Sequence, residues 1–241
     1  MNVLDFFKVK EPWDVKWAHG VNDKKRLETF RSSDVMMIEG DISFSEENKA
    51  IMAHPPKKTS DLTFEEWITS IANSHKGAKL DFKDPKVVIP VLNRLKELNL
   101  SIPIFLNADV LRGPGGDSPK FEPLEFINEC EEFYPRADYL SLGWTVGYDP
   151  LGKYTLKNVE DMIEFSNKSP IPVTLSVLIY YMPSSWEALK MIFENSKDSI
   201  TIWSIKEIPI DEQLKNWVKT HVDPSRTFID AIDENGFPIK L

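Results

Sequence analysis

The sequence predicts an α/β fold, namely a single (β/α)8 TIM barrel that spans residues 1–241. Short apolar segments rich in β-branched and aromatic residues recur eight times along the chain, and segments with helical spacing lie between them. No linker rich in serine and glycine and no change in composition divides the chain. Because single barrels of this kind have about 250 residues, one closed barrel accounts for the whole length.

The expected strands follow one another through the whole chain. The first is VKWAH at 15–19 and the second is VMMIEGDI at 35–42. Each is short and apolar, which is typical of strands buried on both faces. The remaining six lie at 78–83, 102–110, 139–144, 172–180, 199–204 and 227–232.

Between the strands, apolar residues fall three and four apart, as on one face of a helix. Such segments lie at 24–33, 85–99, 123–134, 156–168, 184–196 and 211–222. Strand followed by helix, repeated to the end, is typical of parallel βα units. An open doubly wound sheet is the alternative, but no Gly-x-Gly-x-x-Gly motif follows the first strand, where a dinucleotide-binding sheet usually carries it.

Charge and cysteine content narrow the function classes. Lys and Arg total 29 against 38 Asp and Glu, so the net charge is −9 and no basic run offsets it. We therefore expect no extended groove for nucleic acid, although a small basic pocket for one phosphate is compatible with this charge. Cys130 is the only cysteine, which excludes an intrachain disulfide and a zinc site built from several thiolates.

The first residues include Asp, Lys and Glu where a signal peptide needs an apolar run. No stretch approaches the roughly 20 apolar residues of a membrane span. We therefore expect a cytoplasmic protein without a transmembrane segment.

Polar side chains gather where the expected strands end. In a parallel barrel the loops at these ends build the active face. Side chains two apart on a strand share a face, so Glu39 pairs with Asp41, and Asp81 pairs with Lys83. The polar residues at or near the early strand ends are His19, Glu39, Asp41, His54, Asp81 and Lys83.

Three carboxylates at one pocket mouth predict a bound cation, because clustered carboxylates repel one another unless a cation neutralises them. Oxygen ligands suit Mg²⁺ or Ca²⁺ better than zinc. We expect Glu39, Asp41 and Asp81 to hold this ion. For each acid taken alone, a strand-end surface carboxylate is the structural alternative.

Two imidazoles beside such a metal can act as general base and general acid in the cleavage of a phosphodiester. His19 and His54 are the candidates, and Lys83 would hold an anionic oxygen together with the metal. A histidine that only stabilises its loop is the alternative for His54. We interpret His75 and His221, near helix ends, as solvated or capping histidines.

A set of motifs supports this interpretation. WAHGVN, IEGDI, MAHPP and KLDFK, followed by FLNAD, SLGWT and TIWS, occur in this order between Trp17 and Asp233. The set resembles the menorin-domain family. It is also similar to the wider superfamily of phospholipase-C-like phosphodiesterases, which includes glycerophosphodiester phosphodiesterases and venom sphingomyelinase D enzymes.

The resemblance implies a barrel of the phospholipase-C-like type and roles for its motif residues. His19 and His54 would be the two catalytic histidines, and Lys83 would bind phosphate. Trp203 resembles the tryptophan that walls the pocket. Three acids would bind Mg²⁺ or Ca²⁺: Glu39, Asp41 and Asp81.

Two positions depart from the glycerophosphodiesterase motif. Gly20 stands where that motif has Arg, and Pro55 stands where it has Asp. Loss of the Arg removes a bidentate phosphate clamp, which argues against glycerophosphodiesters as such.

Later strand ends add candidates for substrate binding. Asn107 and Asp109 share a face, and the following loop, LRGPGGDSPK at 111–120, is suited to a flap or rim. Arg112 is a candidate for a second anionic group, with an exposed loop arginine as the alternative. Trp144 and Trp203 are candidates for stacking on a base or head group, with packing at the barrel top as the alternative.

These residues together predict a metal-dependent phosphodiesterase that acts on a small or terminal phosphodiester, such as a lipid head group or a terminal nucleotide. The nucleophile is water, or a neighbouring hydroxyl that would give a cyclic phosphate. The alternative is a catalytically silent menorin-type recognition module with a protein partner. The presence of both histidines, all three acids and Lys83 favours catalysis.

Overall fold

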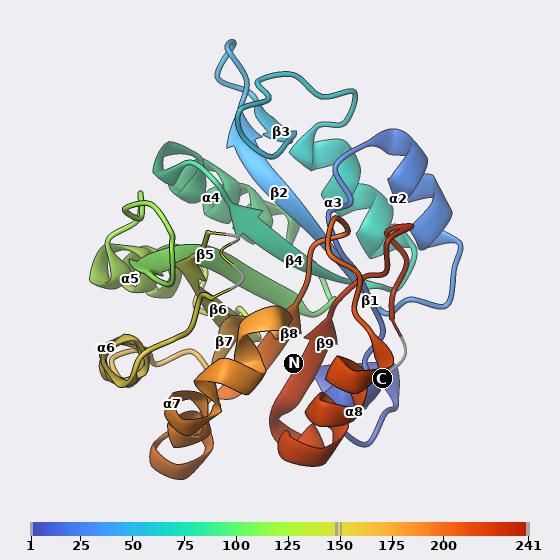
Figure 1. Ribbon diagram of the computed structural model, residues 1–241. Helices are drawn as coiled ribbons and strands as arrows, with labels where there is room; N and C mark the ends of the chain where they lie inside the picture. Colours follow the sequence, from blue (N-terminus) through green and yellow to red (C-terminus); the bar gives the residue numbers. More distant parts are fainter. Residues whose placement is uncertain (1, 148, 150, 240–241) are drawn as a thin grey trace.

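The computed structural model describes residues 2–147, 149 and 151–239, in which eight parallel strands form a barrel with helices around it (Figure 1). The strands lie in chain order around the barrel, and a parallel bridge between Lys16 and Ile229 joins its first and last strands. All eight expected strands are present and the barrel prediction is confirmed. The strands are β1 (Trp17–Ala18), β2 (Met37–Phe44), β3 (Ala50–Met52), β4 (Gly77–Phe82), β5 (Ile104–Arg112), β6 (Tyr139–Thr145), β7 (Val173–Leu178), β8 (Ser199–Trp203) and β9 (Thr227–Asp230).

β3 is not one of the eight expected strands. It pairs antiparallel with β2, outside the parallel ring, and the two form a hairpin that projects beyond the barrel (Figure 1). His54 follows directly after this hairpin. It therefore reaches the barrel from an inserted segment, not from the end of one of the eight parallel strands.

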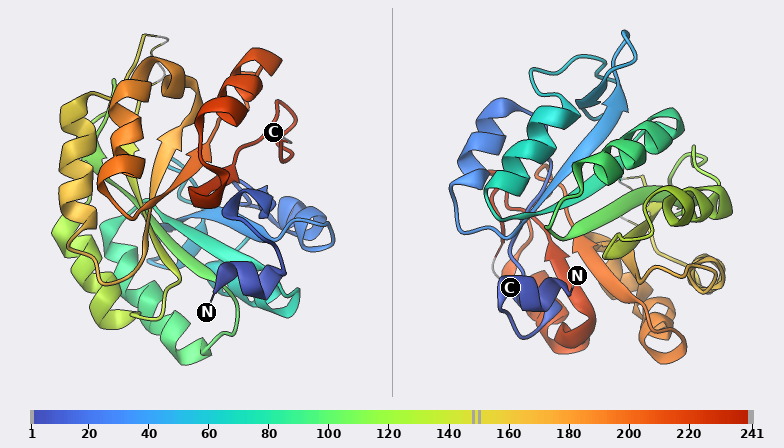
Figure 2. Two further views of the ribbon diagram at one scale, coloured as in Figure 1. Left: turned by 90° about the horizontal axis from the view of Figure 1, so that it is seen from below. Right: turned by 180° about the vertical axis from the view of Figure 1, so that it is seen from behind.

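The helices lie outside the strands in both views of Figure 2. The six expected helices are all present, and a further long helix lies at Phe64–Asn73. No helix of the described ranges is long and apolar enough to cross a bilayer. The helices are α1 (Val3–Phe7), α2 (Lys24–Arg31), α3 (Phe64–Asn73), α4 (Val88–Leu98), α5 (Pro123–Phe133), α6 (Leu156–Ser166), α7 (Met182–Asn195) and α8 (Glu212–His221).

The helix α3 has a clear physical basis in the sequence. The Thr63 side chain accepts a hydrogen bond from the Glu66 backbone N–H, and the Glu66 carboxylate accepts one from the Thr63 N–H. This reciprocal cap satisfies two backbone donors at the start of the helix. Trp67 and Ile71, four residues apart, are then buried against the outside of the barrel.

The barrel interior changes from apolar to polar along its axis. At the amino-terminal end, Trp17, Phe105 and Phe228 pack edge to face, with ring centroids 5.3 to 5.9 Å apart. Aromatic packing of this kind fills the barrel floor. The residues two positions further along the same strands point to the same interior and are polar: His19, Asn107 and Asp230.

Candidate active site

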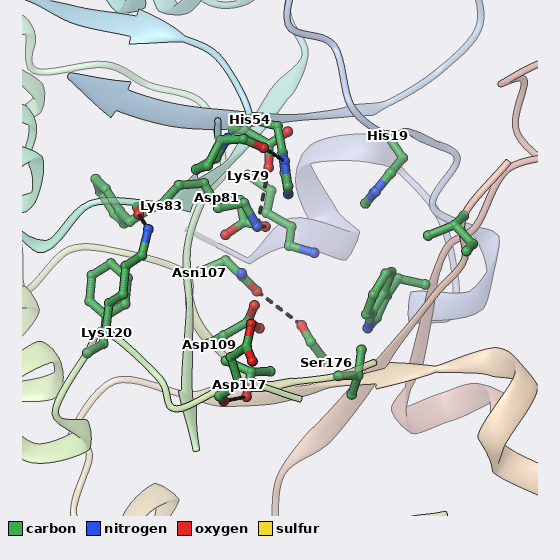
Figure 3. Close-up of a pocket in the computed structure, with 18 of the residues that line it drawn as sticks. His19, His54, Lys79, Asp81, Lys83, Asn107, Asp109, Asp117, Lys120 and Ser176 are labelled. Atoms are coloured by element: carbon green, nitrogen blue, oxygen red, sulfur yellow. Dashed lines mark hydrogen bonds and ion pairs between the residues drawn. The ribbon is translucent and has the colours of Figure 1, made fainter. Parts of the chain in front are cut away.

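A cavity of about 440 Å³ opens at the carboxyl ends of the strands (Figure 3). Eight of the residues expected at the site line it, and Glu39, only 1% exposed, lies beside them. The eight are His19, Asp41, His54, Asp81, Lys83, Asn107, Asp109 and Trp203.

The three expected metal ligands come together. Asp41 and Asp81 are direct neighbours on β2 and β4, and Glu39 lies two positions before Asp41 on the same face. One carboxylate oxygen from each of the three lies within 4.8 Å of those of the other two. Asp81 Oδ1 is buried and has no hydrogen-bond partner within the described ranges. A buried carboxylate oxygen without a donor fits a cation, so this donor set suits an oxygen-preferring divalent ion.

Asn22 fixes the orientation of Asp41. Its Nδ2 donates to Asp41 Oδ2 at 2.5 Å, and its Oδ1 accepts from the Asp41 backbone N–H at 2.8 Å. Both ends of the amide are therefore bound to one residue. Such support restricts the carboxylate to one rotamer, as residues behind metal ligands commonly do.

Lys83 lies against the acidic group. Its Nζ lies 2.6 Å from Asp81 Oδ2 and 3.3 Å from Asp41 Oδ1. Burial lowers the pKa of Lys83, but the attraction of Asp81 and Asp41 outweighs it, and the pKa lies well above its ordinary value. The ammonium is therefore charged at neutral pH and faces the cavity.

His19 is held by two carboxylates. Its Nδ1 lies 3.2 Å from Asp230 Oδ1 and 3.2 Å from Glu39 Oε2. Burial lowers the pKa of His19, but the charges of Glu39 and Asp230 outweigh burial and raise it to about 9. Because carboxylates accept hydrogen bonds, Nδ1 carries a proton, and Nε2 has no partner among the described residues.

Asp230 is in turn bound to a second lysine. Lys79 Nζ lies 2.9 Å from Asp230 Oδ2, and both side chains are at most 3% exposed. Lys79 also forms part of the cavity floor. Burial raises the pKa of Asp230, but Lys79 and His19 outweigh it, so the pKa lies below its ordinary value. The carboxylate is therefore ionised and aligned between an imidazole and an ammonium group.

His54, like His19, has its Nδ1 bound to an oxygen acceptor, but here the acceptor is a backbone carbonyl group. Its Nδ1 lies 2.7 Å from the carbonyl oxygen of Pro55, which can only accept a hydrogen bond. Nδ1 therefore carries the proton, and Nε2 has no partner in the part of the chain that the structure describes. The side chain is exposed at the cavity wall (Figure 3).

The structure does not bring Arg112 and Trp144 to the cavity. Arg112 Nε donates to the carbonyl oxygen of Gly116 at 2.8 Å, so the guanidinium holds its own loop. Trp144 precedes Thr145, which lines the cavity, and strand alternation turns the indole away from the barrel axis. It is 1% exposed and packs on Tyr154, with ring centroids 4.9 Å apart.

The loop between β5 and α5 forms one rim of the cavity, as its sequence predicts. Asp117, Ser118 and Lys120 all line the cavity. Lys120 Nζ donates to the carbonyl oxygen of Lys83 at 3.2 Å, which fastens the rim to the end of β4. The loop therefore brings further charged groups to the mouth of the site.

Gly20 has a conformational reason to replace the motif arginine. Its φ is +66°, in the left-handed region that favours glycine, and its N–H donates to Glu39 Oε2 at 2.5 Å. An arginine here would be strained in this backbone conformation. The backbone N–H thus helps to hold one of the three acids.

Three residues of the site were not among the candidates from sequence. They are Asn22 and Lys79, which belong to the motifs WAHGVN and KLDFK, and Asp230, which lies in the strand expected at 227–232. Lys79 shares a face with Asp81 and Lys83, and Asp230 is a lone acid in an apolar strand, so strand alternation could have found both. Asn22 lies in a loop, where no periodic pattern marks it.

Comparisons with known proteins identify the family. The sequence model of the family described as the Menorin N-terminal domain matches residues 12–235. Protein FAM151B of Homo sapiens is 31% identical over 255 residues, which cover 99% of this chain and 92% of that protein.

Two solved structures share the fold. A putative glycerophosphodiester phosphodiesterase from Galdieria sulphuraria has a TM-score of 0.60 at 14% identity, covering 91% of this chain and 94% of that one. A glycerophosphodiester phosphodiesterase from Agrobacterium tumefaciens strain C58 has a TM-score of 0.53 at 11% identity, covering 92% and 97%. At these identities the similarity shows the fold alone.

Proposed function

This chain belongs to the Menorin N-terminal domain family, as its motifs predict, and on that basis we propose that it is a divalent-metal-dependent phosphodiesterase. The proposed substrate is a small or terminal phosphodiester. One observation carries the proposal: two imidazoles, each with Nδ1 held by an oxygen acceptor and Nε2 unpartnered among the described residues, share a cavity with a group of three acids.

The charges around the cavity support a divalent ion. On the barrel strands and at their ends, two lysine ammonium groups and the protonated His19 face five carboxylates, which leaves an excess of two negative charges when all five are ionised. Asp117 and Lys120 on the rim loop balance each other. One divalent cation would compensate this excess. The carboxylates are those of Glu39, Asp41, Asp81, Asp109 and Asp230.

Glu39, Asp41 and Asp81 would hold the ion, which would supply charge stabilisation to the phosphate oxygens. Burial raises the pKa of Glu39 to about 7, so this acid binds a proton readily when no cation is present. Mg²⁺ and Ca²⁺ both fit an all-oxygen donor set.

The two histidines would share the proton transfers. One Nε2 takes the proton from the attacking oxygen of water or of a substrate hydroxyl as the new P–O bond forms. The other gives a proton to the alcohol oxygen as the old P–O bond breaks. Asp230 would orient His19 and stabilise its protonated form, and the Lys83 ammonium would bind a phosphate oxygen.

The test is a panel of phosphodiesters, with bis(p-nitrophenyl) phosphate as the first compound, assayed with EDTA and after addition of Mg²⁺ or Ca²⁺. We expect metal-dependent release of p-nitrophenol by the parent and a loss in His54→Ala. Binding of metal without turnover of any compound would contradict catalysis and favour the recognition module.

A further inference from the structure

Two side chains on β5 face the cavity with unused hydrogen-bonding groups. Asn107 is 3% exposed, and its Oδ1 accepts from Ser176 Oγ at 3.0 Å. Ser176 Oγ is itself 2.8 Å from Ser141 Oγ. Because the amide oxygen faces Ser176 in the structure, Nδ2 is left as a donor without a partner among the described residues.

Asp109 lies two residues further along the same strand and lines the same cavity (Figure 3). Its carboxylate makes no hydrogen bond and no ion pair with any residue that the structure describes. It also lies outside both groups of residues whose ligand atoms are close enough to share a metal ion. A carboxylate acceptor is therefore available next to the Asn107 donor.

The backbone around Asp109 is arranged to admit this carboxylate. Asp109 pairs with Gly143 on β6, where a Cβ atom would lie 2.2 Å from Asp109 Oδ1. Directly after Asp109 the pairing of β5 with β6 shifts register, between Asp109 and Leu111. Such bulges are common beside active sites, where they redirect side chains.

We propose that Asn107 Nδ2 and the Asp109 carboxylate bind a free hydroxyl group on the alcohol portion of the phosphodiester. This inference rests on the proposed function and adds a substrate class to it. A hydroxyl can donate to Asp109 and accept from Asn107 at the same time. A cationic ammonium head group has no lone pair with which to accept a hydrogen bond from Asn107 Nδ2.

Three matched p-nitrophenyl phosphodiesters test the subsite. Their second ester group is 3-hydroxypropyl, 3-methoxypropyl or propyl, so that the hydroxyl cannot attack phosphorus to form a five-membered cyclic phosphate, and the readout is the ratio of kcat/KM between them. A site that hydrogen-bonds a hydroxyl discriminates strongly against analogues without it, so we expect the parent to prefer the hydroxyl compound by on the order of 10²-fold or more. Because the ratio compares substrates on one protein, it is independent of the folded fraction.

Asp109→Asn and Asn107→Ala should each reduce this ratio by at least about tenfold, the cost of one lost hydrogen bond to a charged or buried partner. Gly143→Ala keeps both side chains but displaces the Asp109 carboxylate, so it should reduce the ratio as well. Glu131→Gln, an exposed acid-to-amide change on α5, should leave the ratio at its parent value.

Equal turnover of the three compounds by the parent, or an unchanged ratio in the variants of Asn107 and Asp109, would overturn the subsite and leave the phosphodiesterase intact. Absence of turnover for every compound in the presence of metal would instead overturn the proposed function, and the subsite with it.

Discussion

His19 Nδ1 lies 3.2 Å from Asp230 Oδ1, although 211 positions separate the two residues in the chain. They meet because the barrel closes β9 against the segment that leads into β1. The same Asp230 carboxylate accepts from the buried Lys79, so one strand end connects the partly buried His19 to a buried charge. This connection makes Asp230 the first residue to test.

Asp230→Asn should lower kcat by on the order of 10² to 10⁴, with a smaller effect on KM, because an amide no longer stabilises the protonated His19. The variant should also be less stable, since it leaves Lys79 buried without its charged partner. Steady-state kinetics and thermal unfolding measure the two effects.

Asp198→Asn serves as the control for stability alone. Asp198 is also a buried acid, and it bonds Ser166 Oγ away from the cavity. The Asp198→Asn variant should be less stable than the parent but keep the kcat of the parent. If Asp230→Asn behaves in the same way as Asp198→Asn, Asp230 has only a structural role.

The pH dependence of stability without metal should report His19. Its pKa is raised to about 9 from an ordinary value of 6.5, so the folded state holds the proton more tightly than the unfolded state. The resulting stabilisation is fully present below about pH 6.5 and is lost as the pH rises through about 9. The free energy of unfolding can be measured by urea denaturation in the presence of EDTA. Between pH 6.5 and 9 it should fall more for the parent than for His19→Gln. Parallel curves for the two proteins would contradict the assignment.

Metal binding should stabilise the fold. If Glu39, Asp41 and Asp81 share one ion, added Mg²⁺ or Ca²⁺ should raise the Tm by mass action. At a hundredfold excess over Kd, the free energy of unfolding should increase by about 2.7 kcal/mol. Asp41→Asn should abolish this rise, and Glu131→Gln should retain it. An unchanged Tm in the parent would count against the site.

The strand-borne part of this site follows from the sequence, because the pleat of a strand fixes which residues share a face. Alternation places Glu39 with Asp41 and Asp81 with Lys83, and parallel pairing brings the two strands together. Asp230 could be recognised as a lone acid in an apolar strand. Its contact with His19, however, depends on barrel closure, which no local pattern encodes.

The loop-borne part could not be predicted in this way. Asn22 acquires its role from a loop conformation that tertiary contacts determine, and the path of His54 depends on the inserted hairpin. Arg112 and Trp144 occupy strand ends without facing the cavity, which corresponds to the alternative that the sequence leaves open for each. The loop carbonyl that Arg112 binds and the alternation that buries Trp144 decide where these side chains point.

The two histidines should act as a unit. His19→Ala and His54→Ala should each remove most turnover, because the base and the acid act in the same cleavage. Groups that share a step are strongly non-additive, so the double variant should be little worse than either single variant. Metal binding, measured by the rise in Tm, should persist in His54→Ala. Additive losses in kcat would show that the two histidines do not share a step.

Lys83 provides the most direct test of the phosphate assignment, because its ammonium contacts both Asp81 and Asp41. If it serves the substrate, Lys83→Met should lower kcat/KM for a phosphodiester by on the order of 10² to 10³, the usual scale for losing one charge-stabilising group. Metal affinity should then be unchanged or tighter, since a competing cation has left the carboxylates. If Lys83 serves only the carboxylates, the same variant should disturb stability and metal binding, while turnover corrected for metal occupancy stays near the parent value. That second pattern would remove Lys83 from the catalytic residues and weaken the case for phosphodiester cleavage, because no other lysine contacts Asp81 and Asp41 within the described ranges.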